Sequence, residues 1–333
     1  MVGAVALAVR RWAPRHEPSV FAAAPRDAWL IVTMDLAALG PSPLAQPLLG
    51  AAEGARAGEL ARLSEACGFD PLGRLRQLMV ASPEAGGEPG LAFSGDFTKD
   101  ELASCAQKVI RARGDTATTT SRGTFTVVED TTYGHVRLAY RDGGLGLVGR
   151  GPWLDAMIDA ADGKGGGPPP EHGALRASLT TDGAPPRALL LTALLPAALR
   201  QRLKSELGSE VPAGGSDAFA GVLAVEQAGL AVATGAAGST TEVAVELRCE
   251  APAACGEVEK LIMRKRAALS RDFGARLVGL GPLLDTLTSE VHGSALSARA
   301  TVPTDDLARA LERFAAQPRP RPAMADADAR AGD

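Results

Sequence analysis

Residues 148–155 of the chain read Val-Gly-Arg-Gly-Pro-Trp-Leu-Asp, and residues 278–285 read Val-Gly-Leu-Gly-Pro-Leu-Leu-Asp. The two octets are identical at six of eight positions and lie 130 residues apart. The rest of the sequence can be aligned around them as two copies of one module. The repeat therefore predicts an internal duplication, in which residues 188–315 superpose on a subset of residues 28–163 with Gly281 over Gly151.

Each octet predicts the end of a strand, a turn and the start of a helix. The Gly-x-Gly pattern, which ends at Gly151 and at Gly281, turns the chain. Pro152 and Pro282 then suit the first helical position, where φ is already set and the missing N–H costs nothing. In the second copy, apolar residues at helical spacing extend this predicted helix to Val291.

Asp155 and Asp285 end the two octets and have two interpretations. We expect them near the first turn of each helix, where a carboxylate interacts favourably with the helix dipole. Alternatively, a pseudo-twofold axis could bring the two carboxylates together, and paired acids can share a proton or hold a metal. The structural interpretation is favoured.

A chain of 333 residues has room for about two domains. The Gly- and Pro-rich run over residues 164–170 is the best candidate boundary. We divide the chain into an N-terminal segment or linker (1–26), module 1 (27–163), a Gly/Pro linker region (164–186), module 2 (187–316) and a disordered tail (317–333).

The predicted strands occur in runs that suit antiparallel pairing, with helices between the runs. Residues 125–128 and 136–140 alternate apolar and polar side chains, and Asp142-Gly143 is a hairpin turn signal. Such an order is typical of the α+β class rather than of a regular parallel sheet. We expect two related modules of mainly antiparallel sheet packed with helices.

Composition and the N-terminus bear on location and partners. The formal net charge of −4 gives no indication of a nucleic-acid partner, which usually requires a basic domain.

The apolar run over residues 2–9, followed by Arg10-Arg11, is too short to cross a bilayer, which needs about 20 residues. It could be the end of a membrane anchor whose beginning is missing, or simply a frayed terminus.

The four cysteines are Cys67, Cys105, Cys249 and Cys255. No C-x-x-C pair or zinc-finger spacing occurs, so two disulfides or four buried thiols are the alternatives. Cys249 and Cys255 flank a predicted strand-to-helix turn and could meet, which leaves Cys67 for Cys105. This pairing would place the protein in an oxidising compartment.

No motif of known chemistry is present. The glycines of residues 144–149 match G-x-G-x-x-G formally, but residues 145–148 look like a strand rather than a turn. The nucleophile elbow, the zinc-binding H-E-x-x-H helix and the phosphate-binding P-loop are missing. The basic cluster over residues 264–266 is typical of a solvated helix end. We predict no catalytic, cofactor-binding or metal-ligating residue.

Three stretches resemble uncharacterised bacterial proteins that carry an N-terminal membrane anchor. They are residues 28–39, Cys67-Gly68-Phe69-Asp70-Pro71-Leu72, and the Gly-x-Gly-Pro of residues 149–152. The resemblance implies an envelope location, membrane-anchored or periplasmic, and no activity. We therefore expect a non-enzymatic envelope protein that binds a partner or ligand between its halves. An enzyme using acids at the module junction and a cytoplasmic structural or assembly protein are the alternatives.

Overall fold

The computed structural model describes residues 19–47, 61–84, 86–132, 135–180, 187–207, 221–234, 238–277 and 280–315. Residues 1–18 of the predicted N-terminal segment (1–26) and the predicted tail over residues 317–333 lie outside these ranges. Residues 19–26 of that segment are more than a linker, because they contain a short helix (Val20–Ala23) that is buried in the core. The fold is α+β, as the sequence predicts.

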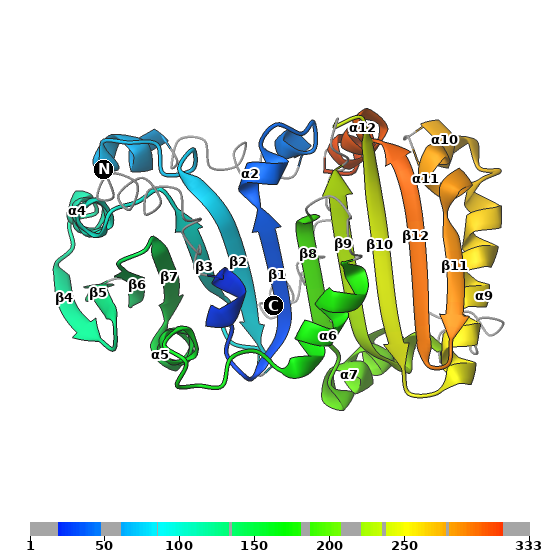
Figure 1. The fold of residues 1–333 in the computed structure, drawn as a ribbon, viewed down its shortest axis with the longest axis horizontal. Coiled ribbons are helices and arrows are strands. Elements are labelled where there is room, and N and C mark those ends of the chain that lie inside the picture. The colour runs from blue at the N-terminus through cyan, green and yellow to red at the C-terminus, as the bar shows by residue number, and fades with distance from the viewer. Residues whose placement is uncertain are drawn as a thin grey trace, which may run out of the picture.

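One antiparallel sheet of twelve strands runs through the whole molecule (Figure 1). Its order is β11-β12-β10-β9-β8-β1-β2-β3-β7-β6-β5-β4. The strands are β1 (Ala28–Asp35), β2 (Leu75–Pro83), β3 (Gly90–Gly95), β4 (Ala117–Arg122), β5 (Phe125–Asp130), β6 (Val136–Arg141), β7 (Leu145–Arg150), β8 (Arg187–Leu194), β9 (Val225–Thr234), β10 (Thr240–Cys249), β11 (Thr288–His292) and β12 (Ala295–Pro303).

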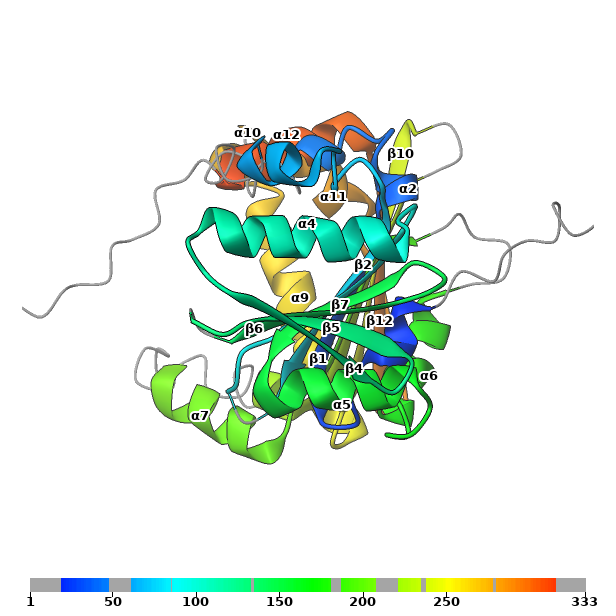
Figure 2. The same cartoon turned by 90° about the vertical axis from the view of Figure 1, so that its left-hand side faces the viewer.

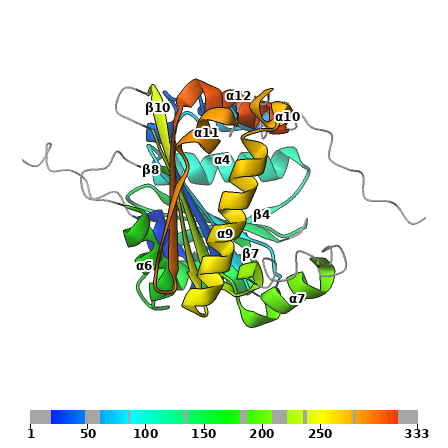
Figure 3. The same ribbon diagram turned by 90° about the vertical axis from the view of Figure 1, so that its right-hand side faces the viewer.

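Helices cover both faces of this sheet. They are η1 (Val20–Ala23), α2 (Leu36–Leu39), α4 (Lys99–Ala112), α5 (Gly151–Ala161), α6 (Pro170–Leu179), α7 (Ala197–Leu207), α9 (Pro252–Leu269), α10 (Phe273–Leu277), α11 (Gly281–Thr286) and α12 (Thr304–Ala315). The side-on views place α5 and α6 on one face and α4 and α9 on the other (Figures 2 and 3). We call these the α5/α6 face and the α4/α9 face.

The main core lies under α5 and η1. Leu154, Met157 and Ile158 recur at helical spacing and are fully buried against the α5/α6 face. Ile31 and Met79 of the central strands join the same cluster and are also fully buried. The part of this face beneath α5 and η1 is therefore closed off from water.

The two halves repeat one strand order outward from the β1–β8 pair, but the octets are not equivalent. In the first half, β7 is the fourth strand from the centre and leads into α5. The fourth strand of the second half is β12, and it leads into α12. Gly151 and Pro152 thus correspond to the start of α12, whereas Gly281 and Pro282 begin α11, before the last two strands.

The prediction that Gly281 lies over Gly151 is wrong because Gly-Pro specifies only a helix start. Both prolines do lie in the first helical turn. However, α10 precedes the second octet where a strand was predicted, and residues 278 and 279 lie outside the described ranges. The predicted helix also fails to reach Val291, because residues 288–292 form β11 and Val291 pairs with Leu296 of β12.

The region over residues 164–186 is more than a linker, because it contains α6. His172, Leu175 and Leu179 share one helical face and are buried against the sheet. Leu179 joins Leu190 and Ala231 in a small core of the second half. Proline-rich flanks suggested a connection, but helical spacing of these buried residues decides the structure.

His172 gives a testable pH dependence of stability. Its Nε2 donates to the carbonyl of Ala28 at 3.0 Å, and its Nδ1 accepts from the hydroxyl of Thr192 at 2.8 Å, so the neutral ring satisfies both groups. Burial lowers the pKa of His172 below its ordinary 6.5. The unfolded chain then binds the proton more readily, so the stabilisation is present above pH 6.5 and is lost as the pH falls below it.

We expect urea unfolding at pH 7.5 and pH 5 to show less stability at the lower pH. His172→Gln, which keeps a donor and an acceptor but does not titrate, is expected to lose part of this difference. An equal pH dependence in both proteins would contradict the role of His172.

Candidate functional site

The main candidate site is an apolar cavity of about 480 Å³ on the α4/α9 face, between helix α4 and the strands that it covers. We call it the α4 pocket. Its lining combines side chains of α4, residues 63–75 and strands β2, β3, β5, β6 and β7, and only Arg113 and Asp130 among them carry charge. The volume falls in the usual range for small-molecule sites, roughly 300–1,000 Å³. Such a lining suits a ligand whose buried part has no polar groups.

Helix α4 forms one wall because its sequence fixes both its start and its apolar face. Thr98 accepts from the backbone N–H of Glu101 at 3.2 Å, and the Glu101 carboxylate accepts from the N–H of Thr98 at 2.9 Å. This capping box satisfies two N–H groups that the helix leaves free. Leu102, Ala106 and Val109 then face the pocket at helical spacing.

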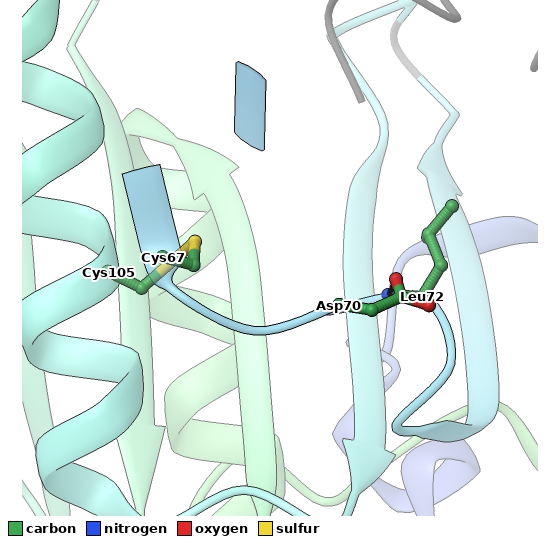
Figure 4. Close-up of a disulfide and its surroundings, with 4 residues drawn as sticks. All are labelled: Cys67, Asp70, Leu72 and Cys105. Atoms are coloured by element: carbon green, nitrogen blue, oxygen red, sulfur yellow. Dashed lines mark hydrogen bonds between the residues drawn. A yellow bond between two sulfur atoms is a disulfide. The ribbon is translucent and has the colours of Figure 1, made fainter. Parts of the chain in front are cut away.

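A disulfide joins α4 to the opposite wall (Figure 4). It links Cys105, which lines the pocket, to Cys67, whose chain continues into a turn in which Asp70 accepts from the N–H of Leu72 at 3.0 Å. Phe69 and Leu72 on this turn line the pocket, and Leu72 is 43% exposed at its mouth. The disulfide thus holds the two walls at a fixed separation.

A charged pair lies at the start of α4, beside Phe69 of the α4 pocket. Arg74 donates to Glu101 at 2.8 Å, and its guanidinium stacks 4.6 Å from the ring centre of Phe69. The hydrogen bond from the Thr98 backbone, followed by that from Arg74, lowers the pKa of Glu101 from 4.5 to about 2. Glu101 therefore stays ionised through the neutral range and keeps both partners.

The apolar surface of the α4 pocket continues across the junction between the halves. From Leu91 at the pocket, directly paired residues run through Val80, Val32, Leu191 and Leu230, one on each successive strand. Paired residues share a face of the sheet, so these side chains form one row. All five are half-buried, whereas Ile31 on the opposite face is fully buried. The α4/α9 face is thus less completely covered at its centre.

The carboxylates of the octets do not form a pair. Asp155 is the fifth residue of α5, beyond the first turn, and contacts Arg122 at 2.8 Å and Arg137 at 2.9 Å. Asp285 contacts Arg276 at 3.3 Å on α11. Figure 1 shows α5 and α11 at opposite ends of the sheet. Each carboxylate therefore belongs to its own ion pairs, which are half-buried at Asp155 and exposed at Asp285.

The second pair of cysteines, Cys249 and Cys255, also forms a disulfide, across the turn from β10 into α9. This bond and the one at α4 confirm the pairing expected from the sequence. Two disulfides indicate an extracytoplasmic location, because reducing compartments rarely keep such bonds. Within the described ranges, no helix has the length and apolarity needed to cross a membrane.

Sequence reasoning missed the α4 pocket. Its lining residues look like ordinary core positions on separate helices and strands, and only their packing leaves a space. One signal was present on β1, where apolar side chains occupy both faces, at Leu30 and Val32 as well as Ile31. A central strand of that kind needs cover on two sides.

No protein family model matches the chain, and no curated protein matches it. Among solved structures, it is similar to TP0453 of Treponema. Crystal form IV gives a TM-score of 0.47 at 13% identity and covers 88% of this chain and 96% of that one. Crystal form III gives a TM-score of 0.45 at 12% identity and covers 88% of this chain and 97% of that one. The resemblance is one of overall fold over most of the chain.

Proposed function

We propose that this protein is a non-enzymatic binding protein of the bacterial envelope that holds a long apolar chain, such as a fatty acyl group. The chain would enter the α4 pocket and continue along the half-buried row toward the junction of the halves. The observation that carries the proposal is the continuity of the α4 pocket with that row.

The dimensions and chemistry of the surface support an elongated ligand. From Leu91 to Leu230 the row crosses four strand spacings, about 19 Å at roughly 4.8 Å each. Burying apolar surface contributes about 25 cal/mol per Å², so a chain along the row would be bound mainly by removal from water. At the pocket, Arg113 ends α4 and could meet an acidic head group.

The envelope location, either periplasmic or held at a membrane through the N-terminus, is part of the same proposal. The disulfides support an oxidising compartment. We favour binding over catalysis because the side chains that line the α4 pocket are apolar, apart from Arg113 and Asp130.

The test is titration of the oxidised protein with a dansyl-labelled fatty acid, monitored by fluorescence. We expect saturable binding at one site. Ala106→Trp places a large side chain into the α4 pocket and is expected to weaken binding by about tenfold or more, since the ligand would clash with the indole. Its melting temperature should not fall, because the indole fills existing space.

Ala112→Trp is the matched control. Ala112 lies on the same helix, is exposed and does not line the pocket. Binding by this variant should equal that of the unmodified protein. Equal affinities for all three proteins, or absence of saturable binding, would refute the proposed function.

A further inference from the structure

A second cavity lies at the junction of the halves, on the α5/α6 face. Its volume is about 250 Å³, and its walls come from η1, β1, β2, α6 and β8. Leu190 lies in its wall and packs against Leu179 of α6, which covers the α5/α6 face. The sheet therefore separates this cavity from the α4 pocket, which lies on the opposite face. Two arginines, Arg176 and Arg187, line it. We call it the arginine cavity.

Arg176 is held rigidly beside this cavity. Its Nη1 donates to the hydroxyl of Thr33 at 2.8 Å, and its guanidinium lies 4.3 Å from the ring centre of Phe21. Burial lowers the pKa of Arg176 from its usual value, although the group stays charged at neutral pH. Within the described ranges no carboxylate forms an ion pair with it.

Arg187 gives the stronger indication that the arginine cavity binds an anion. Its side chain is only 4% exposed, and none of its three guanidinium nitrogens makes an aligned hydrogen bond to the described part of the chain. The carboxylate of Glu242 approaches one nitrogen to 3.5 Å but also contacts Arg299 at 3.3 Å. A buried guanidinium with five donors and no aligned acceptor is costly, so an acceptor from outside the chain would relieve it.

The other polar groups of the cavity fit a small anion. Asp35 is the acidic residue in its wall, and one of its oxygens already accepts from the N–H of Ala38 at 3.0 Å. Thr33 accepts from Arg176 and keeps its own hydroxyl proton to donate. Among the described residues, two arginines face Asp35 and Glu242, and Glu242 also pairs with Arg299. The described lining therefore keeps an excess of positive charge.

We propose that the arginine cavity binds a compact oxyanion group, a phosphate or a carboxylate, between Arg176 and Arg187. Guanidinium groups recognise both kinds of anion through paired N–H donors. The volume admits the anion with a few further atoms. This site lies on the opposite face from the α4 pocket, so it does not depend on the proposed acyl-chain function.

The test uses calorimetric titration of the full chain with inorganic phosphate and, separately, with succinate, in a chloride-only buffer. We expect saturable binding of at least one of them at one site per chain. Arg187→Met removes the buried charge while keeping most of the volume and is expected to weaken binding by about tenfold or more. Arg176→Met is expected to weaken it similarly, and it provides an independent variant should Arg187→Met fail to fold.

Arg264→Met is the control, because Arg264 belongs to the exposed basic cluster of α9 and is absent from the cavity. Retained binding in this variant, together with loss in the cavity variants, supports the site, and the better ligand identifies phosphate or carboxylate. Binding that survives both cavity variants, or that is lost in Arg264→Met, overturns the proposal. Failure of both anions to bind the unmodified protein overturns it as well.

Discussion

Replacing Cys67 and Cys105 with serine is expected to lower the free energy of unfolding by about 4 kcal/mol and to abolish acyl-chain binding. The first effect follows from chain entropy, because this disulfide closes a loop with a sequence separation of 38 residues. The disulfide between Cys249 and Cys255 has a separation of only 6 and should contribute about 2 kcal/mol by the same relation.

The second effect, the loss of acyl-chain binding, is expected for the Cys67–Cys105 disulfide alone, because it lies at the α4 pocket. Cys105 lines the α4 pocket, and the turn that follows Cys67 carries Phe69 and Leu72 on the opposite wall. Without the covalent link, this wall can move away from α4. No such role falls to the disulfide at the start of α9, which lies in the second half.

The measurement compares the double-serine variant of each pair in urea unfolding and in titration with the dansyl-labelled fatty acid. We expect the Cys249–Cys255 variant to keep the affinity of the unmodified protein. Normal affinity after loss of the Cys67–Cys105 bond, or a larger stability loss in the other variant, would contradict the assigned roles.

Much of the local structure could be predicted from the sequence because its signals are local. Thr98 and Glu101 form the capping box that their spacing indicates. The hairpin signal Asp142-Gly143 does lie between paired strands β6 and β7, and the glycine has a positive φ of 97°. The glycines of residues 144–149 belong to a strand and its turn, as the sequence suggested.

The order of elements along the repeat could not be predicted from the octets. A Gly-Pro pair with apolar residues after it determines a helix start, and both octets provide one. What precedes and follows that start depends on distant pairing, such as that of β12 with β10. The octet is therefore a shared local motif at two different places in the topology.

Both candidate sites were beyond sequence reasoning for a related reason. A pocket exists where packing is incomplete, and Leu102 or Phe93 has the same chemistry whether or not its neighbours fill the space. In the sequence, Arg187 comes directly before the apolar residues 188–191 and resembles a residue at a solvated strand end. Only the structure shows that neighbouring elements bury its guanidinium.

Replacing Ile31 with alanine is expected to destabilise the whole protein by about 2–5 kcal/mol. Ile31 is fully buried in the core beneath η1 and α5, and it lies on β1, between Ala81 of β2 and Thr192 of β8. Because β1 pairs directly with β8, strain or loss of packing there acts on the connection between the halves. We therefore expect one cooperative transition that shifts as a unit.

Two spectroscopic probes distinguish this outcome from independent unfolding of the two halves. All three tryptophans, Trp12, Trp29 and Trp153, belong to the first half of the chain, so their fluorescence reports on that half, whereas far-UV circular dichroism reports on both. Coincident urea transitions, both shifted by Ile31→Ala, indicate one folding unit. The exposed Leu269 of α9 serves as control, and its replacement by alanine should change stability by less than about 1 kcal/mol. A dichroism transition that stays in place while the fluorescence transition moves would mean that the halves fold separately, despite their common sheet.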